Sequence, residues 1–124
     1  MAFTLYGISN CDTVRKAKRW LDDGSVDYRF HDLRVDGLDR ATVKHWVDTA
    51  GWEQVLNRRS TSWRTLSQED RDSIDAAAAI EHMLKVPTLV KRPVLEGTNG
   101  ELEIGFKTGQ YQALLEAHTM KTEI

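Results

Sequence analysis

The sequence contains a single cysteine, Cys11, in a chain of 124 residues. A lone thiol cannot form a disulfide within the chain, and unpaired cysteines are typical of reducing compartments. No apolar run is long enough to cross a bilayer, and the first residues, MAFTLYG, lack the basic and apolar regions of a signal peptide. We therefore expect a cytoplasmic protein without a membrane partner.

The sequence also lacks an excess of charge of one sign, with 17 Lys and Arg against 19 Asp and Glu. A net charge of −2 offers no electrostatic basis for binding nucleic acid. There is no glycine-rich phosphate loop, and the four histidines have no metal-ligand spacing. We expect no metal, no bound cofactor and no nucleic-acid partner. The histidines are His31, His45, His82 and His118.

The N-terminal third has the pattern of a strand, a helix and a second strand. Residues 3–8 alternate and are rich in strand formers, and residues 26–33 repeat this pattern with period two. Between them, Val14, Ala17 and Leu21 have helical spacing from residue 12 onward, and Ser9 and Asn10 are good N-cap residues. This order predicts a βαβ unit with parallel strands.

Helical patterns follow, and strands return only near the end. Asp39 is a candidate cap for one helix, and residues 67–85 read as another helix, with Ser67 as its cap. Asn99-Gly100 predicts a hairpin, and residues 108–120 predict a last helix. We therefore predict one α/β domain over 1–124, with a thioredoxin-like mixed sheet (β-α-β … β-β-α) and a helical insertion at about 38–86.

Cys11 has two interpretations, an inert, buried cysteine or a reactive thiol. The inert one is the default for a lone cysteine in a reducing compartment. Its place at the start of a predicted helix favours the thiolate, because unpaired N–H groups and the positive end of the helix dipole lie there. Arg15, one turn on, can add positive charge, and Asn10 can donate a hydrogen bond. These neighbours favour the reactive thiol.

The residue three positions after Cys11 is Val14, so the chain has no C-x-x-C motif. An internal disulfide of the thioredoxin type is therefore impossible. If Cys11 forms an adduct, an external thiol must resolve it. In a reducing cytoplasm that thiol is expected to be glutathione, whose carboxylates need cationic and backbone partners.

Two segments offer such partners. LNRRSTSWR contains Arg58, Arg59 and Arg64, and is either a solvated basic turn or an anion clamp. In KVPTLVKRPVLE, Pro93 precedes a predicted strand. An ordinary strand entry explains Pro93, since only about 5–6% of X-Pro bonds are cis. The alternative is what a thioredoxin-like fold implies, a cis-proline preceded by a residue that faces the active thiol, which here is Arg92.

The segments YGISNCDTVRKAKRWL, LNRRSTSWR and LVKRPVLE…IGF together resemble the ArsC/Spx family, most closely its single-cysteine YffB-like branch. The resemblance covers about residues 3–117 and implies a thioredoxin-like fold. In the arsenate reductases of this family, the cysteine attacks arsenate and glutathione resolves the adduct. The matching positions are Cys11 and, in C-x-x-x-R, Arg15, while Arg92 matches the arginine before a cis-proline.

The resemblance departs from the arsenate reductases at one point. The family's third anion-binding arginine is missing, and Phe106 stands at about that place. Spx regulators carry C-x-x-C and contact RNA polymerase, and the chain lacks their second cysteine. The resemblance implies a glutathione-dependent thiol reductase acting on a small anionic or disulfide substrate. The alternative is an Spx-like binding protein with a protein partner for its helical insert.

These inferences assign the following roles. Cys11 is the nucleophile, and Asn10 and Arg15 support its thiolate. The substrate or glutathione would be bound by Arg92, Pro93 and either Arg58 or Arg59.

Overall fold

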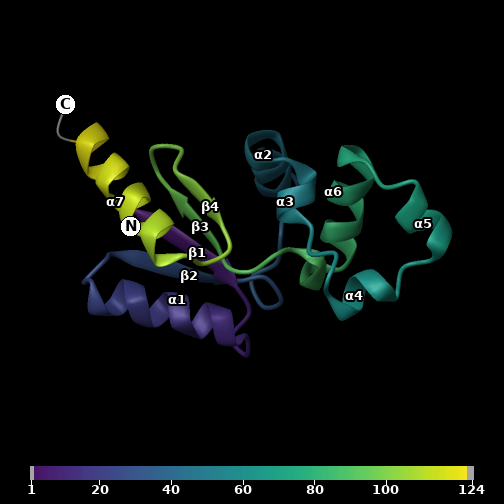
Figure 1. Cartoon of the computed structure of the whole chain (residues 1–124), viewed down its shortest axis with the longest axis horizontal. Coiled ribbons are helices and arrows are strands. Elements are labelled where there is room, and N and C mark those ends of the chain that lie inside the picture. Colours follow the sequence, from purple (N-terminus) through teal and green to yellow (C-terminus); the bar gives the residue numbers. More distant parts are fainter. Residues whose placement is uncertain (1, 123–124) are drawn as a thin grey trace. The chain divides into compact units, whose positions relative to one another are not determined.

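The computed structural model describes residues 2–122, which form two compact units. The first unit, here called the sheet unit, combines residues 2–32 with 92–122, and the second, the inserted unit, comprises residues 33–91. The expected insertion, 38–86, falls inside the inserted unit. In the described chain, no helix is both long and apolar enough to span a membrane. Figure 1 shows the elements, coloured along the sequence.

The sheet unit contains four strands and two long helices. These elements are β1 (Phe3–Gly7), α1 (Asp12–Asp23), β2 (Tyr28–Asp32), β3 (Val94–Gly97), β4 (Leu102–Ile104) and α7 (Thr108–Thr122). The strand order is β2-β1-β3-β4, with β1 parallel to β2 and antiparallel to β3. The predicted mixed sheet and βαβ unit are therefore confirmed, as is the hairpin, where Gly100 adopts a φ of +90° that favours glycine.

Both long helices of the sheet unit contribute to one core. Alternating strand residues face this core, as the period of two requires. The predicted helical spacing in α1 is confirmed, since Val14, Ala17 and Leu21 are all fully buried. The core cluster consists of Phe3 and Leu5 of β1, Leu95 of β3, Ala17 and Leu21 of α1, and Tyr111 and Leu114 of α7.

The inserted unit is helical. Its elements are α2 (Arg40–Ala50), α3 (Trp52–Val55), α4 (Thr61–Arg64), α5 (Gln68–Asp72), α6 (Ala76–Lys85) and the 3₁₀ helix η1 (Pro87–Leu89). Helix α2 packs against α3 and α6, and the predicted cap is confirmed, because Asp39 accepts a hydrogen bond from the Thr42 N–H at 2.8 Å.

The single helix predicted over residues 67–85 is wrong in one respect, because the structure divides it into α5 and α6. Each of the two helices has its own N-cap. Ser67 accepts from the Asp70 N–H at 3.1 Å, and Asp75 accepts from the Ala78 N–H at 2.8 Å. An aspartate cap satisfies the N–H groups of a new helix start and competes with continuation of the preceding helix. Asp75 therefore starts α6 as a separate helix, three residues after α5 ends at Asp72.

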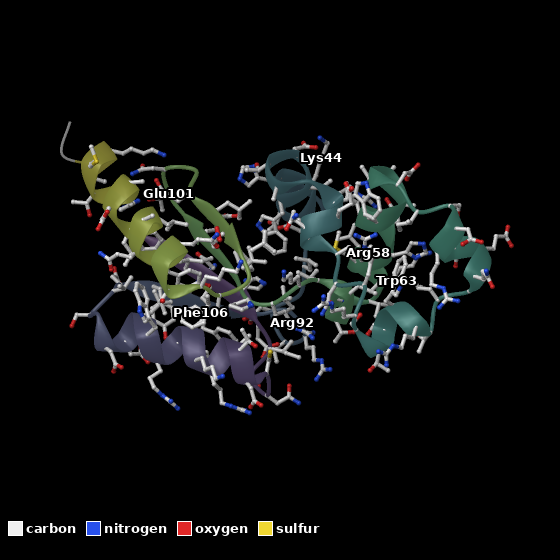
Figure 2. All side chains as sticks on the ribbon, in the orientation of Figure 1. Lys44, Arg58, Trp63, Arg92, Glu101 and Phe106 are labelled. Atoms are coloured by element: carbon white, nitrogen blue, oxygen red, sulfur yellow. The ribbon has the colours of Figure 1, made fainter. Side chains whose placement is uncertain are left out.

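Glu101 ties the hairpin to α7 (Figure 2). Its carboxylate is only 2% exposed, accepts from His118 Nδ1 at 2.9 Å and lies 3.4 Å from Lys121 Nζ. A Cβ added at Gly97 would clash with Glu101 Oε1, so glycine leaves the space that this carboxylate occupies. Burial raises the pKa of Glu101, but hydrogen bonds from His118, the Asn99 N–H and Lys121 outweigh it and hold the pKa below its usual value.

We expect Glu101→Gln to lower the free energy of unfolding at neutral pH by about 1–3 kcal/mol, because a charge-assisted contact is lost inside the fold. A depressed folded pKa gives stability that is complete above the unfolded value of about 4.3 and is lost as the pH falls through the folded pKa. Urea unfolding of the variant should therefore show a flatter acid dependence than the unchanged protein. The exposed Glu69→Gln is the matched control, and parallel acid profiles for Glu101→Gln and the unchanged protein would contradict this role.

Candidate functional site

Cys11 is the N-cap residue of α1. Its backbone is extended (φ −104°, ψ 124°), its N–H donates to the Ile8 carbonyl at 3.3 Å, and its carbonyl accepts from the Arg15 N–H at 3.0 Å. The thiol is free and half-buried, and no side-chain cap hydrogen bond forms at this helix start within the described chain. Ser9 and Asn10 are good N-cap residue types but do not cap α1, because the helix begins at the predicted Asp12 and the N-cap position falls on Cys11. The sulfur occupies the cap position itself.

The end of β1 approaches the first turn of α1 very closely. A Cβ added at Gly7 would lie 2.7 Å from Val14 Cγ2, closer than real Cβ contacts allow. Glycine therefore permits the strand to end directly against the buried side of the helix. This contact fixes the turn from Ile8 to Cys11 between two packed elements and so determines where the thiol lies.

Arg15, one turn after Cys11 in the sequence, is paired with a neighbouring carboxylate. Its Nη2 forms an ion pair with Asp12 Oδ1 in the first turn of α1, and both side chains are exposed. The charge of Arg15 is therefore shared with an adjacent carboxylate, and its predicted support of a Cys11 thiolate stays a prediction. Asn10 is exposed in the turn that precedes Cys11. Its predicted hydrogen bond to the thiolate stays a prediction.

Pro93 lies at the same edge of the sheet as the end of β1. The strands pair Tyr6, the next-to-last residue of β1, with Val94, and Pro93 directly precedes Val94. The Arg92-Pro93 bond is cis, as the family resemblance implied, and the Pro93 carbonyl accepts from the Gly105 N–H at 2.8 Å. The sheet register thus brings Pro93 and the segment leading to Cys11 to one edge.

Arg92 begins the returning half of the sheet unit (Figure 2). The Nε and Nη1 atoms of its guanidinium are buried. A buried guanidinium is planar, permanently charged and suited to bidentate recognition of carboxylates or oxyanions. Its predicted role in binding an anion stays a prediction.

Arg58 and Arg59 belong to the inserted unit, where they line a cavity of about 300 Å³ with Lys91 and Glu53. Two backbone hydrogen bonds join the cavity walls, from Asn57 N–H to the Leu89 carbonyl at 2.7 Å and from Lys91 N–H to the Val55 carbonyl at 2.8 Å. With three cations and one carboxylate among its charged lining groups, this cavity suits an anion.

The cavity favours neither arginine by position, because both line it. The Arg58 guanidinium carbon lies 5.7 Å from the centre of the Trp52 ring, within the range of a cation–π contact. Arg59 is anchored through its backbone, since its N–H donates to Asn57 Oδ1 at 3.1 Å. Arg64, the third arginine of the segment, lies at the end of α4 and does not line this cavity.

Two charged residues that the sequence patterns did not single out lie beside predicted site residues. Asp12 pairs with Arg15, and its adjacency to Cys11 was the available signal. Lys91 shares the cavity of Arg58 and Arg59, and only its place beside Arg92 in KRP pointed to it. Pairing between segments 55–57 and 89–91 brings Lys91 there, and no local pattern encodes that pairing.

Solved structures share this architecture. A YffB protein of solved structure is 45% identical in sequence to this chain. The match covers 91% of this chain and 98% of the YffB chain, and the two structures superpose with a TM-score of 0.86. An arsenate reductase (ArsC) related protein from Brucella melitensis is 50% identical, with 91% and 93% of the two chains covered and a TM-score of 0.72. The predicted thioredoxin-like fold with a mixed sheet is confirmed.

Sequence relatives include regulators as well. The global transcriptional regulator Spx of Streptococcus pneumoniae is 26% identical over 123 residues, which covers 98% of this chain and 91% of Spx. The model of the ArsC family matches residues 6–114 of this chain. The single cysteine at the start of α1 fits the YffB-like branch. With its fold and the extent of this match, the chain is a member of the ArsC family, arsenate-reductase-like in structure.

Proposed function

We propose that this protein is a glutathione-dependent thiol–disulfide oxidoreductase in which Cys11 is the nucleophile. The observation that carries the proposal is a free, half-buried thiol at the N-terminus of a 12-residue helix, at the sheet edge that also holds the cis-proline Pro93. Unpaired N–H groups and the helix dipole stabilise a thiolate there. Because glutathione is the reductant, we place the reaction in the cytoplasm.

The proposed cycle has two exchange steps. The Cys11 thiolate attacks the glutathione sulfur of a mixed disulfide, so that a Cys11–glutathione disulfide forms and the substrate sulfur leaves as a thiolate, which takes up a proton from solvent. A second glutathione thiolate then attacks the glutathione sulfur on Cys11. Oxidised glutathione leaves, and the Cys11 thiolate is restored. The external thiol is required, because the chain has no second cysteine.

The cationic side chains support recognition of anionic groups in this proposal. Arg92 would bind one carboxylate of glutathione, and Arg58 or Arg59, with Lys91, would bind a carboxylate or an anionic substrate. Arsenate is the less favoured substrate. At about the place of the family's third anion-binding arginine, this chain has Phe106, whose ring packs against Tyr111.

Oxidised glutathione should add one glutathionyl group to the protein, and reduced glutathione should remove it. Intact-mass spectrometry measures both steps, and the Cys11→Ser variant is the control that should gain no mass. A protein that gains no adduct, or an adduct that excess reduced glutathione leaves in place, would rule out the proposed cycle.

Asp12→Asn should speed alkylation of Cys11 by iodoacetamide at neutral pH by about two- to threefold at low ionic strength. The change removes a negative charge beside the thiol and releases Arg15 from its ion pair. Asp23→Asn, at the other end of α1, is the matched control and should leave the rate unchanged. If both variants react equally fast, the first-turn charges do not act on Cys11.

Arg58→Ala and Arg59→Ala should separate the two candidate ligands. The variant that loses the anion contact should raise the KM for glutathione by about three- to tenfold, since an exposed charge-assisted hydrogen bond is lost, and should change kcat less. Arg64→Ala removes a neighbouring cation outside the cavity and should leave KM unchanged. Unaltered KM in both Arg58→Ala and Arg59→Ala would remove this cavity from the proposal.

A second candidate function is an Spx-like regulator, which the similarity to Spx over 98% of the chain favours. In that case the protein would bind a macromolecular partner such as RNA polymerase, and Cys11 would be dispensable. Binding to purified RNA polymerase by the unchanged protein and by Cys11→Ser distinguishes the two functions. Equal, stoichiometric binding by both would favour the regulator, whereas no binding by either would favour the enzyme.

A further inference from the structure

A groove of about 370 Å³ lies within the sheet unit, between one flank of α1 and the segment that enters α7. Figure 2 labels Phe106 at this place. The roles proposed above for Cys11 and the arginines do not use this groove. Its lining residues are Lys16, Arg19, Trp20 and Asp23 of α1, with Phe106 and Thr108.

The two aromatic residues that line the groove, Trp20 and Phe106, pack against a buried tyrosine. The rings of Trp20 and Phe106 both pack edge-on against the buried Tyr111, at centroid distances of 5.8 and 4.9 Å. The Tyr111 hydroxyl donates to the Gly105 carbonyl at 3.1 Å. Burial, with a smaller effect of Glu103, raises the pKa of Tyr111, so this hydroxyl stays a donor. The apolar surface offered to a ligand is therefore preformed, which lowers the entropic cost of binding.

The rim of the groove carries two cations. Lys16 and Arg19 lie three residues apart on α1, are exposed, and form no salt bridge within residues 2–122. By contrast, the nearby Arg15 is paired with Asp12. One carboxylate, Asp23, lies among the lining residues, so the charge at the groove is net positive.

The start of α7 adds to this positive potential. Thr108 begins a helix of 15 residues, and the first backbone N–H to enter its ladder is that of Tyr111, which donates to the Lys107 carbonyl at 2.9 Å. The N–H groups before it are those that an α-helix leaves without an internal partner. They favour a negative charge at the same groove that the two cations border.

We propose that this groove binds an acidic peptide segment that carries an aromatic side chain, with the aromatic ring on Trp20 and Phe106 and the flanking carboxylates toward Lys16 and Arg19. Charge complementarity selects this occupant, and a basic segment would meet like charges. The identification of the segment as part of a disulfide substrate rests on the proposed function. Binding of the segment itself does not depend on it.

The helix geometry sets the spacing of such a substrate. Lys16 and Trp20 are five and nine residues after Cys11, which corresponds to a rise of about 7.5 and 13.5 Å along α1. An extended peptide covers about 3.3 Å per residue. The carboxylate that faces Lys16 should therefore lie about two residues, and the aromatic residue about four residues, from the substrate cysteine.

The binding test uses a peptide without sulfur, so that Cys11 chemistry plays no part. The probe is a blocked pentapeptide in which Phe is flanked by two Glu, titrated into the full chain at low salt. Trp20 is the one tryptophan of the sheet unit, and Trp46, Trp52 and Trp63 belong to the inserted unit. We expect the indole N–H signal of Trp20, assigned with Trp20→Phe, to shift in NMR spectra while the other three stay in place. A peptide with two Lys in place of the Glu should bind roughly tenfold more weakly.

Variants of groove residues test the contributions of its cations and of its aromatic surface separately. Lys16→Glu/Arg19→Glu should weaken binding roughly tenfold and remove its salt dependence, and Phe106→Ala should weaken it to a similar extent. Arg29→Glu, which reverses an exposed cation on β2 outside the groove, should leave binding unchanged. The proposal is overturned if the acidic peptide leaves the Trp20 signal unshifted, if the basic peptide binds equally well, or if Phe106→Ala binds like the unchanged protein.

A second measurement separates this proposal from the proposed function. Glutathionylated peptides with the Glu-Phe-Glu sequence three residues from cysteine, or with alanines there, are compared as substrates. Faster release of glutathione from the acidic aromatic peptide, lost in Phe106→Ala, supports the substrate assignment. Equal rates would overturn that assignment while the thiol chemistry stands. Turnover of neither peptide, with the sulfur-free probe still bound, would reject the proposed function and leave the binding site.

Discussion

The contact between Gly7 at the end of β1 and Val14 in the first turn of α1 is the constraint on which the candidate site depends. It holds the strand end against the helix, so the intervening turn has one short path and Cys11 becomes the N-cap of α1. The core then fixes α1 itself, because Ala17 and Leu21 pack with strand and α7 side chains. Cys11 is therefore placed by this packing and by its backbone hydrogen bonds to Ile8 and Arg15, without a side-chain cap.

Charge around the thiol is balanced rather than uniformly positive. Arg15 is paired with Asp12, while the cations Lys16 and Arg19, farther along α1, have no salt-bridge partner among the described residues. In the proposed enzyme, the electrostatic support for a thiolate at Cys11 would therefore come first from the helix terminus, whose N–H groups are fixed in place. In the proposed enzyme, side-chain cations would act mainly on the anionic parts of glutathione and of the substrate.

Much of the fold could be predicted because its signals are local. Hydrophobic spacing predicted α1 and the strands, Asp39 predicted the start of α2, and Asn99-Gly100 predicted the hairpin. The division between α5 and α6 was missed, because Asp75 within an otherwise helical pattern can either stay on a helix surface or cap a new helix. The choice between these conformations depends on packing around the residue, which a local pattern does not contain.

The sequence by itself determined that only one thiol is present, that it follows a strand and precedes an amphipathic helix, and that an external thiol must complete any redox cycle. Only the tertiary structure decided that Pro93 shares the sheet edge of β1, that Lys91 joins Arg58 and Arg59, and that Trp20 and Phe106 form one wall over Tyr111. The physical reason is that strand register and helix packing bring together residues far apart in the chain, and these depend on burial of the whole core rather than on neighbouring residues.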